Sequence, residues 1–101
     1  MSAIRLPIEF IVQDPEVRGG RPIISGSSIR VSDIAAYHIY DGMVPEELAL
    51  QFGLTLSQVH AALAYYFDHR EAIDAEIRSN QEEAESWRRK LERGQPHPTI
   101  V

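Results

Sequence analysis

Residues 44–66, VPEELALQFGLTLSQVHAALAYY, decide the fold, because they carry the start and stop signals of two short helices. Pro45 is tolerated as a first helical residue, and Gly53 can adopt the left-handed backbone that ends a helix. Thr55 and Gln58 have the T-x-x-Q spacing of a capping box, which predicts that a second helix begins directly after the turn. The stretch therefore predicts a helix-turn-helix.

The apolar residues of this stretch have the spacing that a helix-turn-helix needs. Such a unit has a small residue where its helices cross, a glycine at the turn, and branched apolar residues on the buried side of the second helix. These positions are filled, in order, by Ala49, Gly53, Leu54 and Val59. The alternative is an ordinary pair of antiparallel helices, which needs only apolar faces and a short loop.

Composition limits what can surround this unit. At 101 residues and 44% hydrophobic, the chain has room for one small core and little room for an enzyme cleft. It has no cysteine, no membrane-spanning apolar run and no leader, a pattern that favours the cytoplasm. The net charge of −5 opposes general binding to nucleic acid, so any DNA contact must be local.

The residues before this unit are predicted to form a short β segment, residues 1–31. It contains three β-like runs at 10–12, 21–24 and 29–31, which predict a hairpin or a three-stranded sheet. Two arginines of this segment, Arg21 and Arg30, are candidates for contacts to DNA phosphates. The alternative is that they are turn residues paired with acidic neighbours such as Asp33.

A first helix is predicted to start at Ser32 and Asp33 and to end at Gly42. Its expected buried face consists of Ile34, Ala35, His38 and Ile39. With the helix-turn-helix it makes a three-helix core, residues 32–70. The predicted fold class is thus mainly α, a homeodomain-like or winged-helix-like core with a short N-terminal β-hairpin and a long C-terminal helix.

The helical pattern then continues without glycine or proline as far as Gly94, which predicts one long final helix. We expect residues 71–93 to be amphipathic, with apolar residues in two heptad rows, and residues 94–101 to be a flexible tail. Arg70 and Asn80 interrupt the rows, and such a polar residue either fixes the register or oligomeric state or marks a kink. So small a chain offers this helix nothing obvious to cover. It is therefore predicted to bind a partner through Ile73, Ile77, Trp87, Arg88 and Leu91.

No set of residues suggests catalysis. The histidines His38, His60, His69 and His97 are scattered, without the spacing of a zinc site. We therefore expect no enzyme activity, no metal and no cofactor.

Several motifs in combination resemble the bacterial domain-of-unknown-function family 433. They are DPEVRGGRPIISG at residues 14–26, IRV at 29–31, the DG and PEE motifs at 41–42 and 45–47, and VHAALAYY at 59–66. The resemblance implies a helical domain behind a short β segment. It also implies an antitoxin of a toxin–antitoxin pair, whose partner resembles a PIN-type ribonuclease.

Two functional hypotheses follow. In the first, the protein is an antitoxin whose final helix silences the ribonuclease and whose helix-turn-helix binds operator DNA as a homodimer. Its DNA contacts would be Arg21, Arg30, Thr55, Ser57, Gln58, His60 and Ala61. In the second, the protein binds other proteins but not DNA, and the helical core serves as a dimerisation scaffold. A small enzyme ranks last.

Overall fold

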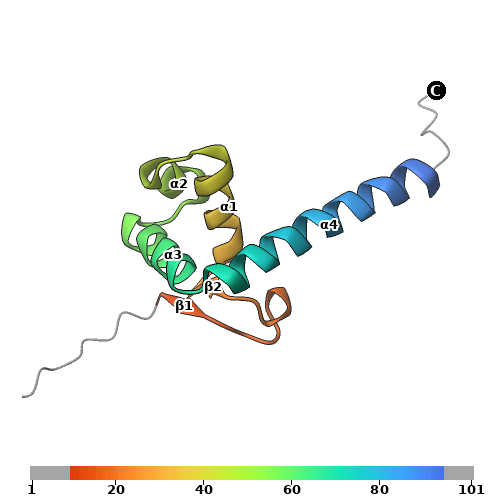
Figure 1. The fold of residues 1–101 in the computed structure, drawn as a ribbon. Coiled ribbons are helices and arrows are strands. Elements are labelled where there is room, and N and C mark those ends of the chain that lie inside the picture. The colour runs from red at the N-terminus through yellow and green to blue at the C-terminus, as the bar shows by residue number, and fades with distance from the viewer. Residues whose placement is uncertain (1–9, 95–101) are drawn as a thin grey trace, which may run out of the picture.

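The computed structural model describes residues 10–94, in which four α-helices follow a small two-stranded sheet (Figure 1). The predicted class, mainly α with an N-terminal hairpin and a long C-terminal helix, is confirmed. Residues 1–9 of the predicted β segment and residues 95–101 of the predicted flexible tail lie outside the described residues. In chain order the elements are β1 (Ile11–Val12), a 3-10 turn (Arg18–Gly20), β2 (Ile23–Ile24), α1 (Val31–Asp41), α2 (Pro45–Phe52), α3 (Leu56–Asp68) and α4 (Arg70–Gly94).

The sheet is a hairpin in which β1 runs antiparallel to β2, with Ile11 opposite Ile24. The third β-like run contributes only an isolated bridge between Ile23 and Arg30, so it forms no strand of its own. A two-stranded sheet of this length is marginal by itself. It is held because Ile23 and Ile24 are both buried against the helices.

The helix-turn-helix signals act as the sequence predicts. Gly53 ends α2 in the left-handed conformation, with φ 65°, and its N–H donates to the carbonyl of Ala49. The capping box at the start of α3 is complete: the Gln58 N–H donates to Thr55 Oγ1 at 3.1 Å, and the Thr55 N–H donates to Gln58 Oε1 at 2.8 Å. α2 and α3 are thus joined by a short, fixed turn.

α1 begins one residue earlier than predicted, at Val31, and ends as predicted at Gly42 with φ 69°. Its first turn is buried, so Ser32 lies in the interior rather than capping the helix. The predicted burial of Ile39 is wrong: its side chain is 42% exposed. Ile39 lies in the last turn of α1.

The prediction of one continuous final helix is also wrong, because the chain turns at His69. This residue has φ −130° and ψ 40°, and it separates α3 from α4. The Tyr66 hydroxyl donates to Asp74 Oδ1 at 2.9 Å and links the two helices across the turn. Burial raises the pKa of the Tyr66 hydroxyl, and its bond to Asp74 raises it further.

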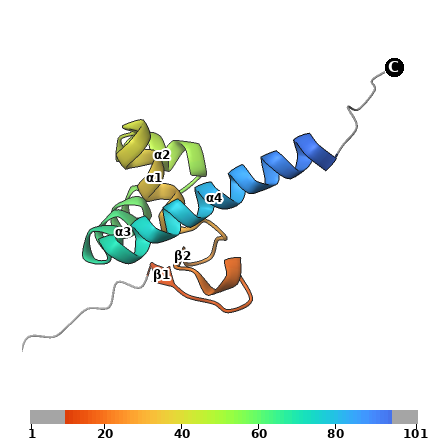
Figure 2. The same cartoon turned by 45° about the vertical axis from the view of Figure 1, so that its right-hand side comes forward.

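The turn lets the first half of α4 fold back onto the hairpin and helices α1, α2 and α3, which together we call the body. Ile73 and Ile77 are 1% and 2% exposed and belong to the same core as residues of α1, α2 and α3. A straight continuation of α3 would carry these two side chains into water. Their burial, at roughly 1.5–3 kcal/mol for each side chain, favours the turn. The second half of α4 extends away from the body in both views (Figures 1 and 2).

Candidate interaction surfaces

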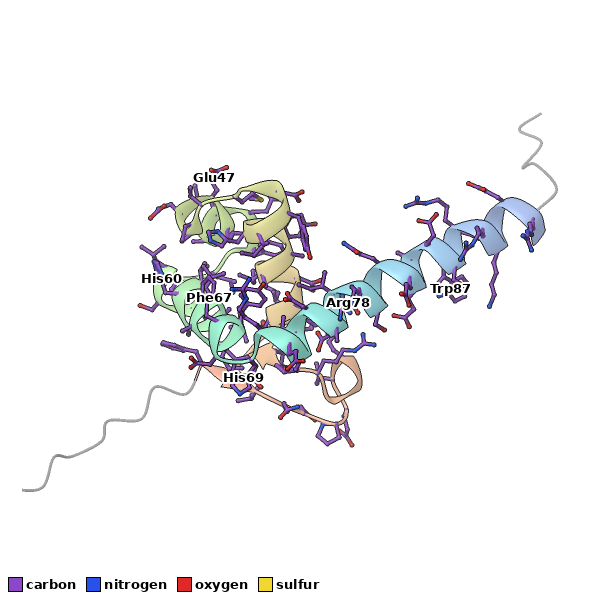
Figure 3. All side chains as sticks on the ribbon, viewed as in Figure 1. Glu47, His60, Phe67, His69, Arg78 and Trp87 are labelled. Atoms are coloured by element: carbon purple, nitrogen blue, oxygen red, sulfur yellow. The ribbon has the colours of Figure 1, made fainter. Side chains whose placement is uncertain are left out.

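The far end of α4 is the most exposed helical surface among the described residues, and we call residues 84–93 the α4 tip. The last side chains that link α4 to the body are Asn80 and Glu83. Asn80 is hydrogen-bonded to Ser32 and Arg30, and Glu83 approaches Arg21. Beyond them the helix is surrounded by solvent in residues 10–94 (Figure 3). The tip spans about 15 Å at the usual helical rise.

Two large apolar side chains are exposed on the α4 tip. Trp87 is 62% and Leu91 is 52% exposed, and they lie one helical turn apart on the same side. The ammonium of Lys90 lies 5.5 Å from the centre of the Trp87 ring, at cation–π distance. An exposed aromatic beside cations has the composition of a protein-binding hot spot.

The α4 tip is basic although the whole chain is acidic. It holds four of the ten basic residues and only Glu85 and Glu92 as acids, for a net charge of +2 against −5 for the chain. The cations are Arg88, Arg89, Lys90 and Arg93. Arg88 lies 3.5 Å from Glu85, but this pair is solvent-exposed and therefore weak. The tip thus presents positive charge to a partner.

The predicted partner-binding set is divided by the structure. Trp87, Arg88 and Leu91 are exposed on the tip, as that prediction requires. Ile73 and Ile77 are buried within the protein itself, so their assignment to a partner surface is wrong. The sequence repeat is the same for both groups, but the core of the body already covers the first half of the helix.

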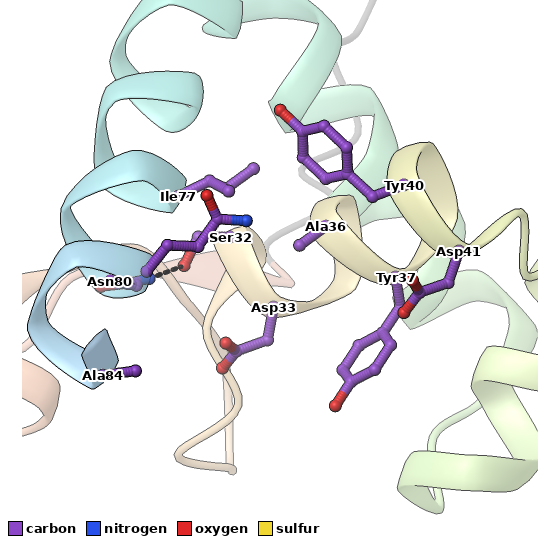
Figure 4. Close-up of a pocket in the computed structure, with 10 residues that line it drawn as sticks. Ser32, Asp33, Ala36, Tyr37, Tyr40, Asp41, Ile77, Asn80 and Ala84 are labelled. Carbon is purple, nitrogen blue, oxygen red and sulfur yellow. Dashed lines mark hydrogen bonds between the residues drawn. The ribbon is translucent and has the colours of Figure 1, made fainter. Parts of the chain in front are cut away.

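A notch between α1 and α4 was missed by the sequence reasoning. It has a volume of about 390 Å³ and lies beside the start of the α4 tip (Figure 4). Tyr37 and Tyr40, 41% and 61% exposed, form its α1 side. Their three-residue spacing opposite the buried face of α1 was the available sequence signal.

The exposed face of α3 carries the predicted DNA contacts. Ser57 and His60 are exposed and Ala61 is half-buried beside them. These three residues lie next to β1. They line an open hollow of about 710 Å³, whose other lining residues are Phe10, Ile11, Ala64, Tyr65 and Asp68. α3 contains no lysine or arginine, so His60 is its only basic side chain. Phosphate attraction by this face is therefore weak at neutral pH.

Two other predicted DNA contacts are occupied by the capping box. The Thr55 hydroxyl and the Gln58 carbonyl oxygen each accept a backbone N–H bond at the start of α3. Using either oxygen to bind a base would uncap the helix, at a cost of about 1 kcal/mol. Their role in the structure is to fix the turn.

Arg30 is held in a structural network, which confirms the alternative prediction that it pairs with Asp33; its role as a phosphate contact stays a prediction. Its side chain is 15% exposed, and it forms a fork on Asp33 through Nε and Nη2, at 3.1 and 3.0 Å. Its Nη1 donates to Asn80 Oδ1 at 3.2 Å. Asn80 in turn donates to Ser32 Oγ at 3.2 Å. This network ties α4 to the start of α1.

Arg21 is less constrained. Its nearest acidic partner is Glu83, at 4.0 Å, and that carboxylate is 62% exposed. An exposed pair at this distance contributes little to stability. Arg21 also lies beside α4, whereas the exposed face of α3 lies next to β1, so the structure does not bring Arg21 and Ser57 together in one described contact.

Within residues 10–94, no three histidine, aspartate or glutamate side chains are placed to hold a metal ion. No helix in this range is long and apolar enough to cross a membrane.

Residues 11–66 match a protein family described as "Protein of unknown function (DUF433)". The matched segment is more than half of the 101 residues. The chain belongs to this family. The resemblance seen in the sequence motifs is therefore confirmed, and the match runs from β1 to Tyr66 in α3, with α4 outside it. No curated protein and no solved structure gave a significant match.

Proposed function

We propose that this protein is the antitoxin of a toxin–antitoxin pair and that its α4 tip binds and silences a PIN-type ribonuclease. The observation that carries the protein-binding part is the exposed Trp87 and Leu91 among four cations. The antitoxin part rests on the resemblance of the sequence motifs. A partner that acts on cellular RNA would place the pair in the cytoplasm. The protein acts by binding and not by catalysis.

The chemistry of the tip suits an acidic nuclease site. Nucleases that use divalent metal ions hold them with carboxylates. A guanidinium such as that of Arg88 can pair with such a carboxylate through two parallel hydrogen bonds. Trp87 and Leu91 would fill an apolar pocket beside that site and provide most of the affinity. The cation would then compete with the metal and with RNA.

Calorimetric titration with a PIN-type ribonuclease from the same genome tests this proposal. We expect the native chain to bind and to inhibit RNA cleavage, and Trp87→Ala and Arg88→Glu each to weaken binding by about tenfold or more. The matched control is Leu50→Ala on α2, a side chain 87% exposed and far along the chain from the tip, which is expected to bind as the native chain does.

Two results would contradict the proposal in different ways. If the tip variants bind the ribonuclease as tightly as the native chain, the tip is not the binding element. If a ribonuclease whose acidic site residues are replaced by alanine binds with unchanged affinity, the cations do not enter that site.

DNA binding is the second candidate function. It is favoured by the α2–turn–α3 geometry, with its complete capping box and exposed Ser57 and His60. It is opposed by the absence of lysine and arginine on α3. A gel shift at low salt tests whether the protein binds DNA. It uses DNA from upstream of the protein's own gene, with the free chain and with its partner-bound form. A shift that His60→Glu abolishes supports DNA binding, and no shift in either form excludes it.

A further inference from the structure

The apolar rows of α4 are buried in the first half of the helix and exposed to solvent in the second half. The rows run through residues 73, 80 and 87 and through residues 77, 84 and 91, which is a heptad repeat. Ile73 and Ile77 of these rows are buried by the body. Trp87 and Leu91 continue the same rows without any cover in residues 10–94. The α4 tip therefore repeats a helix-packing surface for which the body provides no partner.

The charges on this part of α4 reverse along its length. The acidic residues Glu82, Glu83 and Glu85 come first, and the basic residues Arg88, Arg89, Lys90 and Arg93 follow, with Glu92 as the one acid among them. A second α4 laid antiparallel would set each acidic stretch against a basic one. A parallel α4 in register would also bring Glu83 near Arg88 of the second copy, but it would set Trp87 against Trp87, so the side-chain sizes decide the direction. The charge pattern thus fits a second copy of the chain in the antiparallel direction.

The side-chain sizes fit the same direction. Ala84 and Trp87 are three residues apart on the apolar face, the smallest and the largest side chains of its exposed part. An antiparallel pair centred between residues 85 and 86 places Trp87 of each copy over Ala84 of the other. In a heptad seam a large side chain packs best against a small one. The two-fold axis makes this contact twice.

We propose that the α4 tips of two copies of this chain pair antiparallel and form a homodimer. In this register the residues that flank the seam also match, because Glu83 meets Lys90 of the second copy. Glu83 is 62% exposed and only 4.0 Å from Arg21, so it is free to exchange partners. Two Glu83–Lys90 pairs, one on each side of the axis, fit this antiparallel register.

The notch between α1 and α4 lies at the end of this seam. Residues 88–93 of the second copy lie beside residues 78–83, the part of α4 that borders the notch through Asn80 and Gln81. Asp41 on the α1 side is exposed and acidic, and Figure 4 shows it across the notch from Asn80 and Ala84 of α4.

This dimer does not depend on the proposed ribonuclease, but it uses the same side chains. Trp87 cannot be buried against Ala84 of a second copy and in a partner pocket at once. The homodimer would therefore be the form of the free protein, and binding of another protein to the tip would separate the two copies. The test below contains no ribonuclease, so failure of either proposal can be recognised separately.

Sedimentation equilibrium of two charge-reversal variants tests the pairing. Glu83→Lys sets two ammonium groups against each other at this contact, and Lys90→Glu sets two carboxylates against each other. Each variant alone is therefore expected to dimerise about tenfold less tightly. A mixture of the two variants forms heterodimers, in which each of the two contacts joins one ammonium group of the first variant with one carboxylate of the second. We expect the mixture to associate with about the native affinity, because only an antiparallel pairing brings positions 83 and 90 together.

Trp87→Ala tests the apolar seam and is expected to weaken the dimer by about thirtyfold or more. Leu50→Ala is the control and is expected to leave the native mass unchanged, since this exposed residue lies on α2. Circular dichroism checks that every variant keeps its helices. A native chain that is a monomer at all concentrations, or a mixture that associates no better than its components, overturns the proposal.

Discussion

Replacing Ile73 by alanine is expected to lower the free energy of unfolding by about 3 kcal/mol, the usual cost of removing a buried isoleucine side chain beyond Cβ. Ile73 is 1% exposed and belongs to the central core, so its loss leaves a cavity that surrounding helices cannot fill. Urea unfolding of dilute protein, where the chain is monomeric, measures the change.

Leu91→Ala is the matched control for that substitution. Leu91 lies further along α4 in the second heptad row, that of Ile77, but is 52% exposed, so we expect a change below about 0.5 kcal/mol in the monomer. If the two substitutions lowered the free energy of unfolding equally, the first half of α4 would not belong to the core, and the account would be contradicted.

The second large effect is expected at Arg30. Arg30→Ala should lower the free energy of unfolding by about 2 kcal/mol, because it removes a charged fork on Asp33 and a bond to Asn80 in a partly buried site. Arg30→Lys keeps the positive charge but not the fork, and is expected to cost about 1 kcal/mol. Both are measured by urea unfolding.

The Lys substitution distinguishes a structural role from a phosphate contact. A phosphate contact tolerates lysine and leaves the stability of the free protein unchanged. Arg21→Ala serves as the comparison, since its 4.0 Å pair with exposed Glu83 should contribute less than about 0.5 kcal/mol. Similar small effects at Arg21 and Arg30 would contradict the structural network.

The local features of this fold were predictable because their causes lie within a few residues. Thr55 and Gln58 fix the start of α3, and Gly42 and Gly53 end α1 and α2 with positive φ. Each signal is a hydrogen bond or a backbone conformation that its own neighbours determine. For the same reason the short hairpin and the mainly helical class could be read from the sequence.

The features that depend on distant residues could not be predicted in this way. Ile73 and Trp87 occupy equivalent positions of one repeat, and only the turn at His69 makes one of them internal. His69 carries no glycine or proline signal for that turn. The pairing of Arg30 with Asp33 had a local sign, but its bond to Asn80, fifty residues away, had none. The notch beside α1 arises from the same docking of α4.

The division of α4 gives the protein two parts with different roles. The first half completes the body that includes the family segment, residues 11–66, and the α4 tip presents its apolar and basic side chains outside that body. Self-association and binding of a ribonuclease would then be alternative uses of one surface. The concentration of the free chain would determine how much of the tip is available to a partner.

The most direct test of this division is the light-scattering mass, with circular dichroism, of a chain truncated after Glu83, compared with the full chain over a range of concentrations. Glu83 is the last residue that approaches the body through Arg21. We predict that the truncated chain is a folded monomer and that the full chain is a folded dimer. A truncated chain that unfolds, or one that dimerises as the full chain does, would contradict the account.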